Sequence, residues 1–160
     1  MNKGADNLAC ARWLALVVPV LLLGGAYIGQ YAFGLYPCEM CWWQRYPHFV
    51  AIVLAALAFV TPLPRLFVWL AALSIMTSGA IGAFHAGVEY GWWEGLTTCA
   101  TPGLGNGDPL DAVFNAPLVR CDDVQWSLFG ISLAGWNFLV STVSFVVIAQ
   151  LLLRNGHDRA

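Results

Sequence analysis

The sequence predicts an all-α membrane protein: a four-transmembrane-helix bundle with two extracytoplasmic loops that carry two cysteine pairs. Of its 160 residues, 59% are hydrophobic and only 10% are charged, whereas a soluble domain usually carries about 25% charged residues. Four apolar runs are long enough for membrane helices, which need about 20 residues each. Four of the five cysteines fall between these runs. The low fraction of charged residues indicates that the surroundings are a lipid bilayer. The net charge of −2 gives no indication of nucleic-acid binding.

The predicted spans belong to a single integral membrane domain over residues 1–160. Their approximate ranges are 13–33, 42–60, 66–88 and 129–153, and the two outer loops are expected at about 34–41 and 89–128. The first run is too long for a cleavable signal and belongs to a series of spans. In the third span, small residues recur at every fourth position, which predicts a close contact with another helix. These residues are Ser74, Ser78, Gly82 and Ala86.

The orientation follows from the basic residues, because Lys and Arg are enriched in cytoplasmic segments. Five basic residues fall on the side of the termini and two on the opposite side. The first group is Lys3, Arg12, Arg65, Arg154 and Arg159; the second is Arg45 and Arg120. We therefore expect both termini in the cytoplasm and both loops outside it.

This orientation divides the cysteines between two redox compartments. Cys38 and Cys41 fall in the first outer loop, Cys99 and Cys121 in the second, and Cys10 near the cytoplasmic face. Disulfides persist on the oxidising side of a membrane, so the pattern predicts two disulfides among the four outer cysteines. Cys10 is left without an oxidised partner, and we expect it to be a small apolar filler.

Two other interpretations of the four outer cysteines remain open. Structural zinc usually takes two closely spaced pairs, but here only Cys38 and Cys41 are close, while 21 residues separate Cys99 from Cys121. Two structural staples are the stronger alternative. The C-x-x-C spacing favours a redox pair over a staple, because it makes a small ring suited to opening and closing.

The surroundings of Cys41 also favour redox chemistry. It falls at the expected first turn of the second span, where helix N–H groups stabilise a thiolate. Arg45 follows four residues later, on the same helix face, and its charge can support a negative sulfur or a reduced acceptor. An anchor at the lipid headgroups is the alternative for Arg45. His85, near the outer end of the third span, is either a helix-contact histidine or part of a ligand site.

The chain resembles the bacterial disulfide bond formation protein B (DsbB) family. The resemblance rests on "PCEMCWWQR" (37–45), a histidine near the outer end of the third span, the cysteine pair of the long loop and "QWSLFGISLAGW" (125–136). It covers essentially the whole chain. It implies a multi-pass protein of the bacterial inner membrane that reoxidises a periplasmic thioredoxin-fold DsbA-like protein. It also implies that the electrons pass to a membrane quinone, either ubiquinone or menaquinone.

The resemblance further implies a role for each site residue. Cys99 would form the mixed disulfide with the partner, and Cys121 would be its mate. Cys38 and Cys41 would be the quinone-coupled pair, with Cys41 nearest the ring. Arg45 matches an arginine that supports quinone reactivity, and His85 corresponds more loosely to a quinone-side residue.

Two alternative functions stay open at this point. One is a non-enzymatic membrane protein whose outer loops carry two structural disulfides. The other is a vitamin K epoxide reductase-like enzyme, which shares the chemistry; the cysteine order and the "QWSLFG" segment favour the DsbB family.

Overall fold

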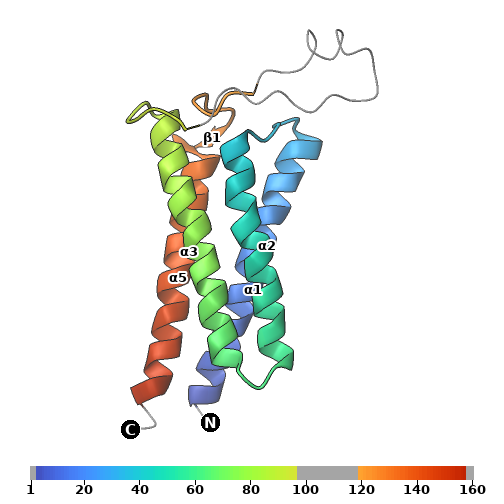
Figure 1. Cartoon of the computed structure of the whole chain (residues 1–160), viewed down its shortest axis with the longest axis vertical. Coiled ribbons are helices and arrows are strands. Elements are labelled where there is room, and N and C mark those ends of the chain that lie inside the picture. Colours follow the sequence, from blue (N-terminus) through green and yellow to red (C-terminus); the bar gives the residue numbers. More distant parts are fainter. Residues whose placement is uncertain (1–2, 97–118, 158–160) are drawn as a thin grey trace.

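The computed structural model of the chain describes residues 3–96 and 119–157, and its main part is a bundle of long helices (Figure 1). The helices are α1 (Lys3–Ala32), α2 (Glu39–Val60), α3 (Pro64–Glu89) and α5 (Leu133–His157); two short strands are β1 (Ser127–Leu128) and β2 (Ile131–Ser132). Within the described residues, four helices are long and apolar enough to cross a membrane. The predicted four-helix fold is therefore confirmed.

Helices α1, α2 and α3 begin before the predicted spans, because polar residues continue these helices past their apolar parts. Helix α5 instead begins at Leu133, later than the predicted start at residue 129, because residues 127–132 form the β1–β2 hairpin. Helix α1 starts at Lys3 and α2 at Glu39. Cys38 is the N-cap of α2: its backbone is extended, and its sulfur accepts a hydrogen bond from the Cys41 N–H at 3.4 Å. The loop before α2 is therefore shorter than expected, and Cys41 lies within the first helical turn.

The two ends of the bundle differ in what they carry. The first turn of α1, the last turn of α5 and the connection between α2 and α3 lie at one end (Figure 1). The connection between α1 and α2 lies at the other end, together with the short β1–β2 hairpin. This second end holds Cys38 and Cys41. Cys10 lies on α1 and is exposed on the surface of the bundle.

The main core is built largely from small side chains, which lets the helices approach closely. Its buried alanines come from α1, α2 and α3: Ala11, Ala15, Ala51, Ala55, Ala58, Ala71 and Ala72. The predicted small-residue contact of α3 is present against α5. A Cβ atom at Gly82 would lie 2.9 Å from the Ala134 carbonyl oxygen, a distance that only glycine avoids.

A second buried cluster closes the cysteine end of the bundle. It contains Cys38, Met40, Val88, Val119 and Cys121. The hairpin is fastened to this end through Tyr90, whose hydroxyl accepts from the Ser132 N–H at 2.9 Å and donates to the Gly130 carbonyl at 3.3 Å. The hairpin is thereby held against the C-terminal end of α3.

Candidate functional site

Cys38 and Cys41 form a dithiol in this structure. Their sulfur atoms lie 3.2 Å apart, a hydrogen-bonding distance at which the Cys38 thiol donates to Cys41. Cys38 is buried, whereas Cys41 is partly accessible. The hydrogen bond to Cys41, followed by burial, raises the pKa of the Cys38 thiol to about 12. Cys38 therefore holds its proton, and a negative charge on the pair belongs on Cys41.

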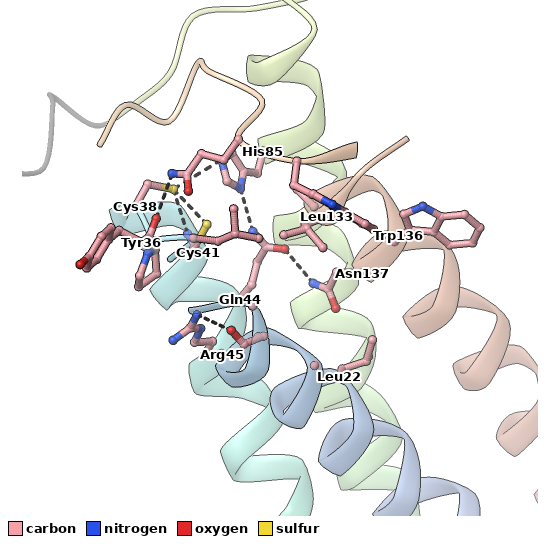
Figure 2. Close-up of a pocket in the computed structure, with 18 of the residues that line it drawn as sticks. Leu22, Tyr36, Cys38, Cys41, Gln44, Arg45, His85, Leu133, Trp136 and Asn137 are labelled. Carbon is pink, nitrogen blue, oxygen red and sulfur yellow. Dashed lines mark hydrogen bonds between the residues drawn. The ribbon is translucent and has the colours of Figure 1, made fainter. Parts of the chain in front are cut away.

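His85 contacts the pair from α3 (Figure 2). Its Nε2 atom lies 3.5 Å from the Cys38 sulfur and 3.9 Å from a carboxylate oxygen of Glu89. Its Nδ1 atom lies 2.8 Å from the side-chain nitrogen of Gln44. His85 is thus both a helix-contact residue and a member of the cysteine site, which joins the two interpretations left open by the sequence.

Arg45 lies one turn after Cys41 on α2 and is 6% exposed. Its Nη1 donates to Gln30 Oε1 at 2.7 Å, and its guanidinium lies 4.9 Å from each of the Tyr27 and Trp42 ring centres. No carboxylate of the described residues lies within ion-pair distance of it. Burial of the side chain against α1 favours a role inside the bundle over an anchor at the lipid headgroups. Arg45 is a buried cation whose charge no described side chain neutralises.

A cavity of about 240 Å³ joins these groups. Cys38, Cys41, Arg45 and His85 all line it. Apolar side chains supply much of the remaining wall, among them Leu21, Leu22, Leu35, Leu133 and Trp136. An apolar cavity with a few convergent polar groups is typical of a small-molecule site, and this one is slightly below the usual range of about 300–1,000 Å³.

Of Cys99 and Cys121, only Cys121 belongs to the residues that the structure describes. Cys121 packs in the same buried cluster as Cys38, and its backbone hydrogen-bonds to the His85 ring. Cys99 lies outside the described residues, so its predicted pairing with Cys121 is not tested. The structure brings Cys38, Cys41, Cys121, Arg45 and His85 to one end of the bundle.

Three of these residues also have the ligand atoms of a soft metal site. The sulfurs of Cys38 and Cys41 and a ring nitrogen of His85 lie within 4.8 Å of one another. Structural zinc takes four such ligands, and the described residues offer no fourth His, Cys, Asp or Glu in this group. The three residues fit a thiol pair with a neighbouring imidazole at least as well as they fit a zinc site.

The sequence interpretation missed Gln44, His48 and Asn137, which are polar residues inside membrane helices. His48 Nε2 donates to Asn137 Oδ1 at 2.9 Å, and Asn137 Nδ2 donates to Gln44 Oε1 at 2.8 Å. All three line the cavity. A signal was available, because polar side chains within membrane spans are costly and generally mark functional sites.

Comparisons with known proteins identify the family of the chain. The profile described as "Disulfide bond formation protein DsbB" matches residues 9–151. Disulfide bond formation protein B of Polaromonas sp. (strain JS666 / ATCC BAA-500) is 28% identical over 86% of this chain and 88% of its own length. The protein of the same name from Chromohalobacter salexigens is 29% identical over 87% of each chain.

An uncharacterized protein of Rickettsia prowazekii, RP370, is 22% identical over 92% of this chain and 89% of its own length. No solved structure matches the chain at a significant level. The family match favours a disulfide bond formation protein over the vitamin K epoxide reductase-like alternative. With its four membrane helices and its cysteine pair beside a buried arginine, this chain belongs to the DsbB family of disulfide bond formation proteins.

Proposed function

We propose that this protein reoxidises a periplasmic thioredoxin-fold, DsbA-like dithiol oxidase and passes the two electrons through its cysteine pairs to a membrane quinone. The observation that carries the proposal is the shared cavity: a C-x-x-C dithiol and a buried arginine with no ion-pair partner among the described residues line the same apolar space. A structural staple needs neither the cavity nor the cation. The family relationship supports disulfide bond formation as the reaction class.

The electron route consists of two thiol–disulfide exchanges followed by one oxidation. In the first exchange, a partner thiolate attacks Cys99 of a Cys99–Cys121 disulfide, and the partner leaves as a disulfide. In the second, the resulting dithiol reduces a Cys38–Cys41 disulfide to the form seen here. The packing of Cys121 against Cys38 supports this second exchange. The Cys38–Cys41 dithiol then gives up two electrons and two protons as its disulfide re-forms.

The residues around the cavity fit a quinone headgroup. A bound quinone supplies an acceptor for two electrons and two protons, dissolved in the same lipid as the helices. Arg45 would hold the oxygen on which negative charge develops, since a charge-assisted hydrogen bond in a buried place contributes about 1.5–3 kcal/mol. The leucines and Trp136 would contact the ring and exclude water. Cys41 would be the sulfur that faces the ring, because Cys38 is buried and keeps its proton.

The orientation of the protein is part of the proposal. With the termini in the cytoplasm, the cysteine end of the bundle faces the periplasm, where a soluble dithiol oxidase can reach the second loop. DsbA-type proteins are strong oxidants, so their reoxidation requires an acceptor such as a quinone.

A single assay tests the proposal. The purified protein in lipid nanodiscs is mixed with a reduced DsbA-like oxidase, with and without ubiquinone or menaquinone. We expect partner oxidation and quinone reduction in equal amounts, with neither when the quinone is omitted. Partner oxidation that is independent of quinone would contradict the proposed acceptor. If neither reaction occurs with either quinone, the non-enzymatic alternative with inert disulfides is correct.

A further inference from the structure

A chain of buried hydrogen bonds crosses the bundle from α5 to the cysteine pair, and its direction can be read from the backbone. Asn137 Nδ2 lies 3.2 Å from the Ser78 carbonyl oxygen and 2.8 Å from Gln44 Oε1. A backbone carbonyl only accepts hydrogen bonds. The nitrogen of Asn137 therefore faces Ser78, and the same amide group donates to Gln44.

A second backbone carbonyl fixes the amide of Gln44. Its Nε2 donates to the Met40 carbonyl at 3.3 Å and lies 2.8 Å from His85 Nδ1. Because this nitrogen is a donor, His85 Nδ1 must accept. A neutral imidazole carries one proton, so the proton of His85 is on Nε2, the atom that lies 3.5 Å from the Cys38 sulfur. Glu89, whose carboxylate lies 3.9 Å from the same Nε2 atom, favours the same tautomer.

Every donor in the chain thus points toward Cys41. Asn137 donates to Gln44, Gln44 to His85, His85 to Cys38 and Cys38 to Cys41 (Figure 2). Hydrogen bonds aligned in this way polarise one another, and the acceptor at the end gains the most stabilisation for negative charge. The sulfur at the end of the chain is the one that the first turn of α2 also favours as a thiolate.

We propose that Gln44 and Asn137 are positioning residues that hold His85 in its Nε2–H tautomer and thereby make Cys41, and not Cys38, the thiolate of the reduced pair. They act through His85 and touch neither sulfur in the described contacts. The inference deepens the proposed function and rests on it for its purpose, since the thiolate is the sulfur that reacts. The tautomer itself can be measured without any quinone or partner.

The first test is the nitrogen NMR spectrum of His85 in the reduced protein, labelled with ¹⁵N-histidine and assigned with a His85→Asn variant. We expect a protonated Nε2 and a bare Nδ1 at neutral pH. A proton on Nδ1 in the native protein would overturn the proposal directly. This measurement needs no variant of Gln44 or Asn137, so misfolding of a variant cannot obscure it.

Two substitutions should then reverse the tautomer from different positions. Gln44→Glu places an ionised carboxylate beside Nδ1, which can only accept, so Nδ1 must gain a proton. Asn137→Asp forces the Gln44 amide to turn its nitrogen toward α5 and its oxygen toward His85, with the same result. Ser141→Ala is the matched control, because Ser141 Oγ donates to Asn137 Oδ1 at 3.2 Å and lies outside the directed chain.

The functional readout is the choice of cysteine. In a Cys99→Ser/Cys121→Ser background, the reduced protein is treated briefly with iodoacetamide at neutral pH, and the modified residue is identified by mass spectrometry. We expect alkylation of Cys41 over Cys38, and a fall in that ratio of about tenfold in Gln44→Glu and Asn137→Asp, equivalent to about one pKa unit. Ser141→Ala should leave the ratio unchanged.

The outcomes separate this proposal from the proposed function. An unchanged His85 tautomer in Gln44→Glu would overturn the positioning role. An equal fall in the alkylation ratio in the control Ser141→Ala would also overturn it. A native tautomer with preferential alkylation of Cys41, in a protein that fails to reduce quinone, would leave the positioning role standing and remove the quinone.

Discussion

Cys121 packs against Cys38 in one buried cluster, although the two residues belong to different loops in the sequence. The backbone of Cys121 also hydrogen-bonds to the ring of His85, whose Nε2 atom lies 3.5 Å from the Cys38 sulfur. Cys121 is therefore buried at the same end of the bundle as the Cys38–Cys41 dithiol.

Replacing one cysteine of each pair should stop the reaction at different stages. Cys121→Ser should accumulate a mixed disulfide between Cys99 and the partner, because the thiol that resolves it is absent. Cys41→Ser should abolish quinone reduction. Non-reducing gels and quinone absorbance measure these two results, and Cys10→Ser, at the other end of the bundle, is the control. A mixed disulfide through Cys38 would reverse the assigned electron path.

Arg45→Ala should slow quinone reduction or raise the quinone KM by about ten- to a hundredfold, since the only buried cation lining the described cavity is lost. Arg45→Lys should recover part of this, because the charge returns without the planar fork that bonds Gln30 and Ala26. Formation of the partner mixed disulfide should be unchanged. Arg65→Ala, which loses a hydrogen bond to the Leu152 carbonyl at 2.7 Å, is the matched control. Equal losses in both assays would make Arg45 a folding residue.

Cys38 should resist alkylation well into the alkaline range. Its folded pKa of about 12 lies above the ordinary thiol value of 9.0. The thiol's contribution to stability is therefore complete below pH 9.0 and is lost as the pH rises toward 12. The rate of Cys38 alkylation against pH measures this in a Cys99→Ser/Cys121→Ser background. Cys41→Ala removes the hydrogen bond that is the largest cause, so the profile should move to lower pH. A native profile centred near 9.0 would refute the assignment.

Gly82→Ala should weaken the contact between α3 and α5. The added methyl group would lie 2.9 Å from the Ala134 carbonyl oxygen and 3.1 Å from side-chain atoms of Gln44 and Asn137. Overpacking of this kind costs about 1–3 kcal/mol, so thermal unfolding in detergent should start at a lower temperature. Gly24→Ala is the control, because nothing lies within 4 Å of its added methyl group. Equal stability of both variants would show that the helices separate easily here.

Metal chelation should leave activity intact, because the pair works as a dithiol and no fourth ligand completes the group of Cys38, Cys41 and His85 among the described residues. Added zinc should slow turnover by binding the reduced sulfurs, and a chelator should restore it. Quinone reduction after dialysis against EDTA is the measurement. Loss of activity that zinc restores would establish a metal cofactor.

The sequence is informative about the helices and the pair, because apolar length and C-x-x-C spacing are local properties. It predicted Cys41 in the first turn of α2 and the small-residue contact around Gly82, and both are present. The hydrogen-bonded chain was not predictable, since Gln44 and Asn137 meet only through the packing of α2 against α5. The position of Cys121 was not predictable for the same reason, since it is buried in a cluster with residues that are distant in the sequence, such as Met40 and Val88.

The Cys38 sulfur is also the N-cap of α2, where it accepts from the Cys41 N–H at 3.4 Å. The Cys38 sulfur is therefore both a member of the dithiol and the cap of the helix. When that sulfur bonds to Cys41, the cap must change its geometry, so the redox state is coupled to fraying of the first turn. Deuterium uptake at the Cys41 amide would then differ between the dithiol and the disulfide forms, with no label attached to either sulfur.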